Sequence, residues 1–239
     1  MTVMASRIST FALVFLISSV QQVYAEGFGI NATRVIYRQQ DKSVQVVMRN
    51  TTAASVYLVR SGVVNDQGVP VESFEVIPPL FRLDAGSEGA VRVMQRPGNT
   101  FPADRESLFY FYSLAIPSTN PLTVAGRETL GQLRVTVGNR IKFIYRPASL
   151  PVPDSHIFQQ VTFSRVPAGV QVKNPTPYYI SLSSLRIDGV SVPLSDKGSE
   201  LIAPFGSRIY LSRSRNKQAV KWSVINDIGA TESFTAAVR

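Results

Sequence analysis

Residues 133–147 read LRVTVGNRIKFIYRP and combine two patterns in one segment. An apolar row alternates with polar residues, which is the period of a β-strand, and it comprises Leu133, Val135 and Val137. Three cations lie close together in the second half of the segment, namely Arg140, Lys142 and Arg146. A strand of this length would span roughly 50 Å, which is longer than a typical strand.

Short alternating segments recur on both sides of this strand, and no apolar run at helical spacing exceeds two turns. They occupy residues 43–50, 55–64, 89–95 and 107–116 before it, and 161–166, 169–174, 178–187, 207–212, 219–226 and 232–238 after it. Segments of this length, separated by Gly, Asn, Asp and Pro, are typical of antiparallel sandwiches rather than of βαβ units. The sequence therefore predicts an all-β protein.

A proline-rich stretch follows the opening strand directly. Residues 146–154 read RPASLPVPD, and three prolines in so short a stretch favour a semi-rigid link. We therefore expect two β-sandwiches joined by a linker over residues 147–153, with the first over residues 26–146 and the second over residues 154–239.

The first 25 residues resemble a secretory signal peptide. Arg7 supplies a positive start, residues 11–20 are apolar, and residues 23–25 (VYA) place small side chains at the cleavage site. A membrane anchor is the alternative, but this apolar run is much shorter than the roughly 20 residues that span a bilayer. We expect export of the chain and no stable membrane insertion after residues 1–25 are removed.

Composition narrows the class of protein further. The chain has no cysteine, so the folded part has to rely on ordinary hydrophobic cores, and thiol catalysis is excluded. The net charge is +9 at pH 7, which in a cytosolic protein would suggest nucleic acid. Export argues against nucleic acid as a partner, and the basic run at residues 211–217 is interpreted as a solvated loop. The composition leaves open a second interpretation, in which a smaller group of basic residues binds a carboxylate-bearing partner.

The residues that enzymes need are mostly missing. His156 is the only histidine and cannot form a zinc site or a catalytic triad alone. The carboxylates do not form convincing acid–base pairs, and no glycine-rich phosphate loop follows a strand. Residues 31–33 (NAT) and 50–52 (NTT) match glycosylation acceptors, which is a weak signal. We expect no catalytic activity, no metal and no cofactor.

Several segments together resemble one known family. They are residues 33–37 (TRVIY), 78–83 (PPLFRL), 102–117 (PADRESLFYFYSLAIP), 139–147 (NRIKFIYRP), 174–182 (NPTPYYISL) and 225–230 (INDIGA). In this order they resemble the periplasmic chaperones of the chaperone–usher pilus pathway. The resemblance implies two immunoglobulin-like sandwiches in a boomerang arrangement, located in the periplasm, which bind pilus subunits and deliver them to the outer-membrane usher.

The resemblance also implies a use for the apolar row. The family lends the long seventh strand, here around residues 131–145, to a groove in the immature subunit. Leu133, Val135 and Val137 would then enter successive pockets of that groove. The alternative from alternation alone is that the row faces its own sandwich core.

For the cations, the resemblance implies that Arg34 and Lys142 grip the C-terminal carboxylate of the subunit. The alternative for Lys142 is a lysine that protects a sheet edge against aggregation. Lys142 has the opposite parity to Val137, so the strand must twist or bulge, or the lysine must act from another face.

The resemblance implies two further groups. Glu106, Arg146 and Asp227 match an interdomain ion network that fixes the angle of the cleft, the alternative being unrelated surface charges. Pro78, Pro79 and Ile116 match exposed positions used towards the usher.

The chain departs from the family pattern in two places. Residues 118–132 form a longer connection than in short-loop members, and the cysteines common in long-loop members are absent. Gly62 stands where many relatives carry a large aromatic residue, which leaves the packing around that strand open. Two other classes also stay open, a pilin or adhesin and a secreted sandwich protein that is an enzyme or binds carbohydrate.

Overall fold

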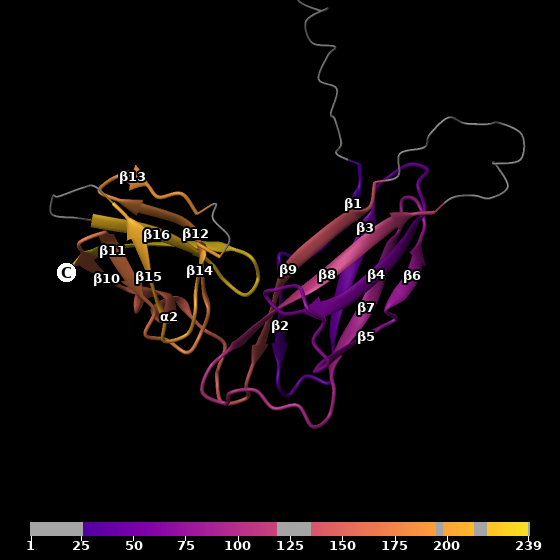
Figure 1. The fold of residues 1–239 in the computed structure, drawn as a ribbon, viewed down its shortest axis with the longest axis horizontal. Helices are drawn as coiled ribbons and strands as arrows, with labels where there is room; N and C mark the ends of the chain where they lie inside the picture. The colour runs from indigo at the N-terminus through magenta and orange to yellow at the C-terminus, as the bar shows by residue number, and fades with distance from the viewer. Residues whose placement is uncertain (1–25, 119–134, 195–197, 213–218, 239) are drawn as a thin grey trace, which may run out of the picture.

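A computed structural model describes residues 26–118, 135–194, 198–212 and 219–238. The expected signal peptide and Leu133 lie outside the described residues. The described chain forms two β-sandwiches, the N-terminal sandwich of strands β1–β9 and the C-terminal sandwich of strands β10–β17 (Figure 1). The prediction of an all-β chain built from two sandwiches is confirmed.

The N-terminal sandwich consists of two sheets. The four-stranded sheet has the order β1–β3–β7–β5, and the five-stranded sheet has the order β2–β9–β8–β4–β6. The strands are β1 (Phe28–Ile30), β2 (Arg34–Arg38), β3 (Val44–Asn50), β4 (Tyr57–Val64), β5 (Phe74–Ile77), β6 (Leu80–Leu83), β7 (Glu88–Gln95), β8 (Ser107–Pro117) and β9 (Val137–Arg146).

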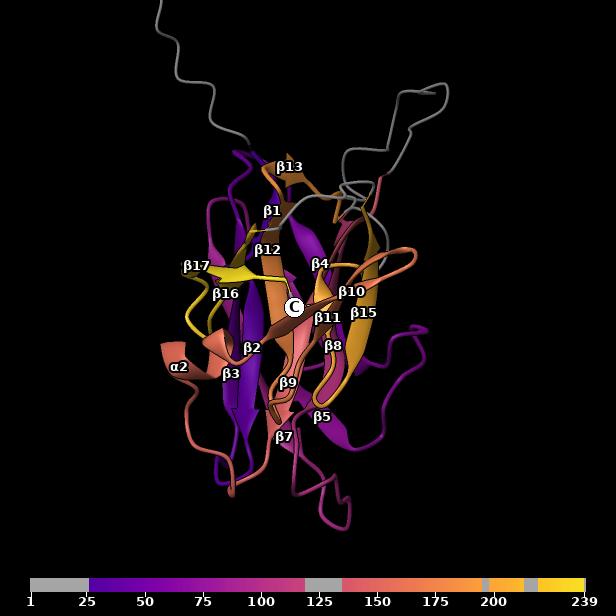
Figure 2. The same cartoon turned by 90° about the vertical axis from the view of Figure 1, so that its left-hand side faces the viewer.

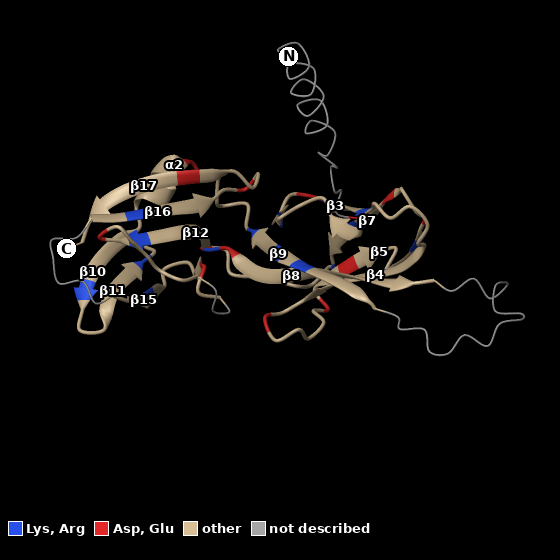
Figure 3. Ribbon diagram, turned by 90° about the horizontal axis from the view of Figure 1, so that it is seen from above, with Lys and Arg blue, Asp and Glu red and all other residues tan. Residues whose placement is uncertain are grey.

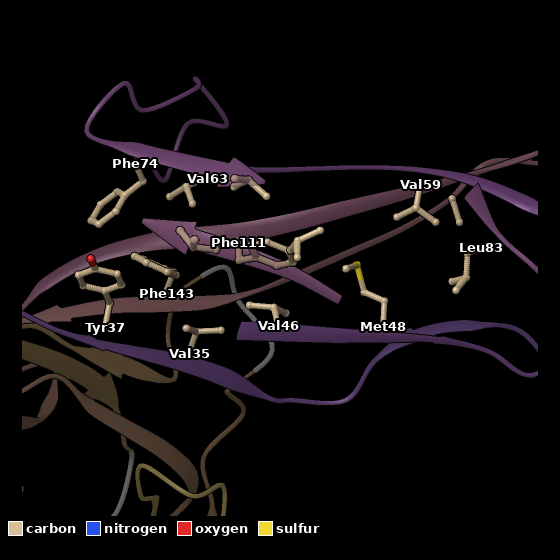
Figure 4. Close-up of a cluster of buried hydrophobic side chains, with 14 of the residues drawn as sticks. Val35, Tyr37, Val46, Met48, Val59, Val63, Phe74, Leu83, Phe111 and Phe143 are labelled. Carbon is tan, nitrogen blue, oxygen red and sulfur yellow. The ribbon is translucent and has the colours of Figure 1, made fainter. Parts of the chain in front are cut away.

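Alternation explains the core between these sheets. In β3 and β7 every second residue is buried, and these side chains face those of β4, β8 and β9 from the other sheet (Figure 4). Met48, Val93 and Phe143 are fully buried there. Phe74 packs edge-on against Phe143 at 4.8 Å between ring centroids, an arrangement that aromatic pairs favour.

The C-terminal sandwich is smaller. Its three-stranded sheet has the order β10–β11–β15, and its second sheet has the order β13–β12–β16–β17, with β14 pairing β12. The strands are β10 (Thr162–Val166), β11 (Gly169–Lys173), β12 (Ile180–Ile187), β13 (Val190–Ser191), β14 (Leu201–Ile202), β15 (Ser207–Leu211), β16 (Ala219–Ile225) and β17 (Thr231–Ala237). Trp222 is the centre of its core and packs against Phe163. Figure 2 shows this sandwich in front of the N-terminal one.

A short helix begins the C-terminal sandwich and buries Phe158 in its core. After β9 the chain passes the prolines, and helix α2 (Ser155–Gln159) begins behind Asp154, whose carboxylate accepts hydrogen bonds from the first free backbone N–H groups. His156 is exposed in the first turn of α2. This turn of helix agrees with the absence of longer helical periodicity from the sequence.

Asn50 shows why a glycosylation-like triplet can be structural. Its side chain is buried and donates to the backbone carbonyls of Ser55 and Asp84, while its own oxygen accepts from Thr52. Asn174 and Thr176 repeat this arrangement in the C-terminal sandwich. The triplet at residues 50–52 therefore fixes a turn by satisfying buried backbone groups.

Gly62 has an aromatic neighbour across the sheet. It pairs with Tyr112, and a Cβ atom at Gly62 would lie 2.7 Å from the tyrosine ring. The glycine lies on the outer face of β4, because its neighbours Ser61 and Val63 are buried on the inner face. The ring of Tyr112 thus covers the position where an aromatic side chain of β4 would stand.

Candidate functional site

Strand β9 has one unpaired edge. Along Val137–Tyr145 it pairs with β8 in a continuous antiparallel register, but its parallel partner β2 begins only opposite Lys142. Among the described strands, none pairs with the other side of residues 137–141. These residues therefore offer backbone N–H and C=O groups to a further strand.

The described strand is shorter than the sequence predicts. Continuing the register would set Val135 opposite Pro117, which has no backbone N–H to donate. The ladder therefore ends at Val137, while residues 131–134 of the predicted strand lie outside the described residues.

The valines of the row lie on the core-facing side of β9 but are not covered. Ile141 and Phe143 have the same parity as Val137 and belong to the core of the N-terminal sandwich. The exposed fraction nevertheless rises along this side to 37% at Val137 and 61% at Val135. The apolar line thus continues past the end of its own sandwich into solvent.

Arg34 and Lys142 form a pair of neighbouring cations. They stand opposite each other in the parallel register of β2 and β9, so their side chains leave the same face of the sheet. The Nη1 atom of Arg34 donates to the backbone oxygen of Ile225 at 2.8 Å, whereas its buried Nε atom has no partner among the described residues. Burial lowers the pKa of Arg34, although Asp227 and Glu106 counteract the shift.

Lys142 acts from the opposite face to the valines. The register of β9 shows no bulge between Val137 and Tyr145, so alternation alone sets the two directions. Lys142 points to the C-terminal sandwich, where its Nζ atom lies 3.1 Å from the carboxylate of Glu200. Ile144 leaves the same face and is buried, which shows that the face is covered there. Figure 3 shows basic residues of β9 in blue where the two sandwiches meet.

Glu106, Arg146 and Asp227 are brought together at the junction. Arg146 forms a two-point ion pair with Asp227, with hydrogen bonds of 2.6 and 2.9 Å. Its Nε atom donates to Glu106 at 2.8 Å, and the second oxygen of Glu106 accepts from the backbone N–H of Tyr179 at 2.7 Å. Glu106 and Arg146 come from the N-terminal sandwich, and Asp227 and Tyr179 from the C-terminal one. Both members of the Arg146–Glu106 pair are almost fully buried.

The network keeps Arg146 charged. Burial alone would lower its pKa, but the hydrogen bonds and charges of Asp227 and Glu106 outweigh that effect and raise it. Two-point pairing of a guanidinium with a carboxylate also fixes their mutual orientation. The geometry therefore favours a rigid connection between the sandwiches.

A pocket of about 500 Å³ is lined by residues of both sandwiches. Tyr110, the partner of Lys142 across β8 and β9, lines it from one sandwich. Tyr179, Leu201 and Arg208 line it from the other.

Comparison with known proteins gives consistent results over both sandwiches. The family model described as "Pili and flagellar-assembly chaperone, PapD N-terminal domain" matches residues 27–151, and "Pili assembly chaperone PapD, C-terminal domain" matches residues 156–236. The chain belongs to the family of pili assembly chaperones. The resemblance read from the sequence is therefore confirmed, and with it the immunoglobulin-like sandwiches in a boomerang arrangement. The family is one of assembly chaperones, not of enzymes.

Individual relatives of this chaperone agree with that assignment. Chaperone protein FimC of Escherichia coli is 34% identical over 204 residues, which cover 85% of this chain and 81% of the relative. Chaperone protein HifB of Haemophilus influenzae is 31% identical over 213 residues, covering 87% and 86%.

Solved structures agree as well. The E. coli chaperone DraB superposes with a TM-score of 0.76 at 32% identity, covering 90% of this chain and 97% of DraB. The SafB chaperone of Salmonella enterica, solved in complex with the SafA pilin, superposes with a TM-score of 0.76 at 25% identity and the same coverage. These matches favour neither of the other classes, the pilin or adhesin and the carbohydrate-binding protein.

The three remaining predicted site residues of the chaperone are exposed. Pro78 and Pro79 connect β5 and β6, and the carbonyl of Pro79 accepts from the backbone N–H of Ser61 on β4. Ile116 on β8 stands opposite Leu58 of β4. Leu58 and Ile116 are both exposed, so the outer face of the five-stranded sheet is partly apolar here.

The described residues contain no group of three or more His, Asp or Glu side chains that could hold a metal ion. Within the same part of the chain, no helix is long and apolar enough to cross a membrane.

Three members of the site were not predicted from the sequence. Glu200, the backbone oxygen of Ile225 and the backbone N–H of Tyr179 contact the cations or their network from the C-terminal sandwich. Two are backbone groups, which carry no residue signature. Glu200 lies beside a two-residue strand that is too short for periodicity to reveal.

Proposed function

We propose that this chain is a periplasmic chaperone that binds pilus subunits and passes them to the outer-membrane usher. The observation that carries the proposal is the unpaired edge of β9, which bears uncovered valines and leads to two adjacent cations. Membership of the family and the solved SafB–SafA complex support a pilus subunit as the partner.

The subunit adds a strand to β9. An extended segment that pairs with residues 137–141 satisfies their free backbone groups, while Val135 and Val137 enter the apolar groove of the subunit. Leu133 belongs to the same row in sequence and lies outside the described residues. Each pocket filled by a leucine or valine contributes about 1.5–3 kcal/mol. Capture therefore proceeds on apolar burial, without catalysis or a cofactor.

The cations set the register of the added strand. A carboxylate at Arg34 and Lys142 places the C-terminus of the subunit at the point where β2 begins, so its last strand runs parallel to β9. The buried Nε atom of Arg34, which has no acceptor among the described residues, is a donor that such a carboxylate would use.

The ion network of Glu106, Arg146 and Asp227 holds the cleft at the angle this binding requires. It does not contact the subunit, and its role is geometric. The exposed Pro78, Pro79 and Ile116 contact the usher. Ile116 shares the outer face of the five-stranded sheet with Lys142, but it lies near the far end of β8, away from Tyr110, which stands opposite Lys142.

We also propose the domain organisation expected from the sequence, with cleavage of residues 1–25 and a linker over residues 147–153. The last residue of β9 and the first residue of α2 bracket that linker.

Periplasmic co-expression tests the proposal. The tagged chaperone is produced together with the pilin encoded beside its gene, and the periplasmic extract is purified by the tag. A soluble one-to-one complex is expected, with loss of the pilin when the chaperone is omitted. A pilin that accumulates equally without the chaperone, or a chaperone that polymerises by itself, would overturn it.

A further inference from the structure

Lys142 already has a carboxylate partner in the empty protein. Glu200 of the C-terminal sandwich lies 3.1 Å from the Nζ atom of Lys142, and their side chains are 18% (Lys142) and 34% (Glu200) exposed. The contact crosses the cleft, because Lys142 comes from β9 and Glu200 immediately precedes β14. Glu200 therefore pairs with the same lysine that, in the proposed function, binds the carboxylate of the subunit.

A mostly covered ammonium group needs a counter-charge, which Glu200 supplies while no subunit is bound. Two carboxylates at one lysine repel each other, so an incoming carboxylate and Glu200 compete for it. Glu200 is tethered through the interdomain network and acts at a high effective concentration. Its exposure nevertheless leaves it partly solvated, so it can be released into water.

We propose that Glu200 is a built-in competitor that caps Lys142 in the empty chaperone and is displaced by the C-terminal carboxylate of the subunit. This inference rests on the proposed function, because it assumes that Lys142 binds a carboxylate. It adds a residue that tunes affinity from the opposite sandwich. Because binding breaks the Lys142–Glu200 contact, the chaperone favours ligands that offset this cost with contacts along β9.

The test uses a synthetic probe in place of a subunit. A fluorescent peptide of about ten residues, long enough to pair with the unpaired edge, carries valine at alternate positions and either a free C-terminal carboxylate or an amide. Its dissociation constant is measured by anisotropy for the wild type, Glu200→Gln, Lys142→Ala and the double variant. Glu75→Gln, on edge strand β5, is the control for the change in net charge.

For the acid peptide, Glu200→Gln is expected to bind about two- to tenfold more tightly than the wild type, the range for a partly exposed ion pair. The amide peptide should show no such gain. In the Lys142→Ala background the effect of Glu200→Gln should vanish, since the two residues act on one contact. Glu75→Gln should match the wild type.

The outcomes separate this inference from the proposed function. If the wild type prefers the acid to the amide but Glu200→Gln does not tighten binding, Glu200 is only an interdomain contact and the inference fails, while the anchor stands. If Glu200→Gln still tightens binding in the Lys142→Ala background, or if Glu75→Gln tightens binding equally, the effect is general charge repulsion. Either result would also overturn the inference. Equal binding of acid and amide by the wild type, or no binding by any variant, would remove both the anchor and its competitor.

Discussion

Arg146 and Asp227 are joined by two hydrogen bonds, of 2.6 and 2.9 Å, between the last residue of β9 and the turn that follows β16. This contact links the strand that carries the proposed binding row to the second sandwich. We expect this contact to help set the orientation of β9 towards the cleft.

Removal of Arg146 should destabilise the chaperone more than removal of Asp227. Arg146→Ala leaves Glu106 buried without its cation and should cost about 3–5 kcal/mol of unfolding free energy. Asp227→Ala leaves Arg146 paired with Glu106 and should cost about 1–2 kcal/mol. Urea unfolding followed by circular dichroism measures both, and fluorescence of the single Trp222 reports on the C-terminal sandwich.

Arg82→Ala is the matched control, because Arg82 pairs with Asp84 at a largely exposed position. It should change stability by no more than about 0.5 kcal/mol. A loss for Asp227→Ala that equals or exceeds the loss for Arg146→Ala would contradict the burial-based ranking.

Charge in the apolar row should abolish subunit binding without unfolding the protein. Val135→Glu and Val137→Glu place a carboxylate where a groove of the subunit would close, but both positions are exposed in the free chaperone. Stability should therefore change by about 0.5 kcal/mol or less. The readouts are co-purification of the pilin and the melting temperature.

Val190→Glu is the control for this pair, since Val190 is an exposed valine of the C-terminal sandwich and should keep its pilin. Val93→Glu, in the core, should unfold the N-terminal sandwich. If Val135→Glu and Val137→Glu unfold the chaperone as Val93→Glu does, the row belongs to its own core.

Loss of either anchoring cation should weaken subunit binding strongly. Arg34→Ala or Lys142→Ala leaves one cation for a buried carboxylate, at a cost of about 3–5 kcal/mol, or two to four decades in affinity. The stability of free Lys142→Ala should change by about 1 kcal/mol or less, because Glu200 is partly solvated. Surface plasmon resonance with immobilised pilin measures the affinities.

Lys221→Ala, which removes an exposed lysine from β16, controls for net charge and should bind normally. A pilin without its C-terminal residues should show the same defect as Lys142→Ala, with no further loss when the two are combined. Normal binding by both alanine variants would leave Lys142 as a lysine that protects a sheet edge.

A charge at Ile116 should impair fibre assembly but not the binding of the subunit. Ile116→Asp places a charge on the exposed face that we assign to the usher, so the chaperone–pilin complex should form while fibre assembly stops. Leu211→Asp, at an exposed position of the C-terminal sandwich, should assemble fibres normally. Electron microscopy of the cell surface checks both variants, and normal fibres with Ile116→Asp would remove the usher assignment.

Periodicity was sufficient for the long strands and failed for the short ones. The alternation over residues 107–116 corresponds to β8 within one residue, because a strand of that length shows its period several times. β1, β13 and β14 have two or three residues each, so no period can be read from them. Helix α2 was not predicted, because its capping residue Asp154 ends a proline-rich stretch that indicates a linker.

The site could be predicted only where one strand contains it. The positions of Val135, Val137 and Lys142 along one strand were readable from the sequence, and so was their opposite parity. Which sandwich each face meets was not readable, since the answer depends on how β9 packs against the second sandwich. The partner of Lys142, Glu200, comes from a contact between residues 58 positions apart that only the fold brings together.

Hydrogen–deuterium exchange along β9 tests the central claim most directly, because that claim is the pairing of a subunit strand with residues 137–141. Exchange is compared between the free chaperone and its one-to-one complex with the pilin. The account predicts strong protection of every second amide in this stretch on binding, namely those that face the unpaired edge, while the amides already bonded to β8 change little. Binding of the pilin with unchanged exchange along residues 137–141 would contradict it.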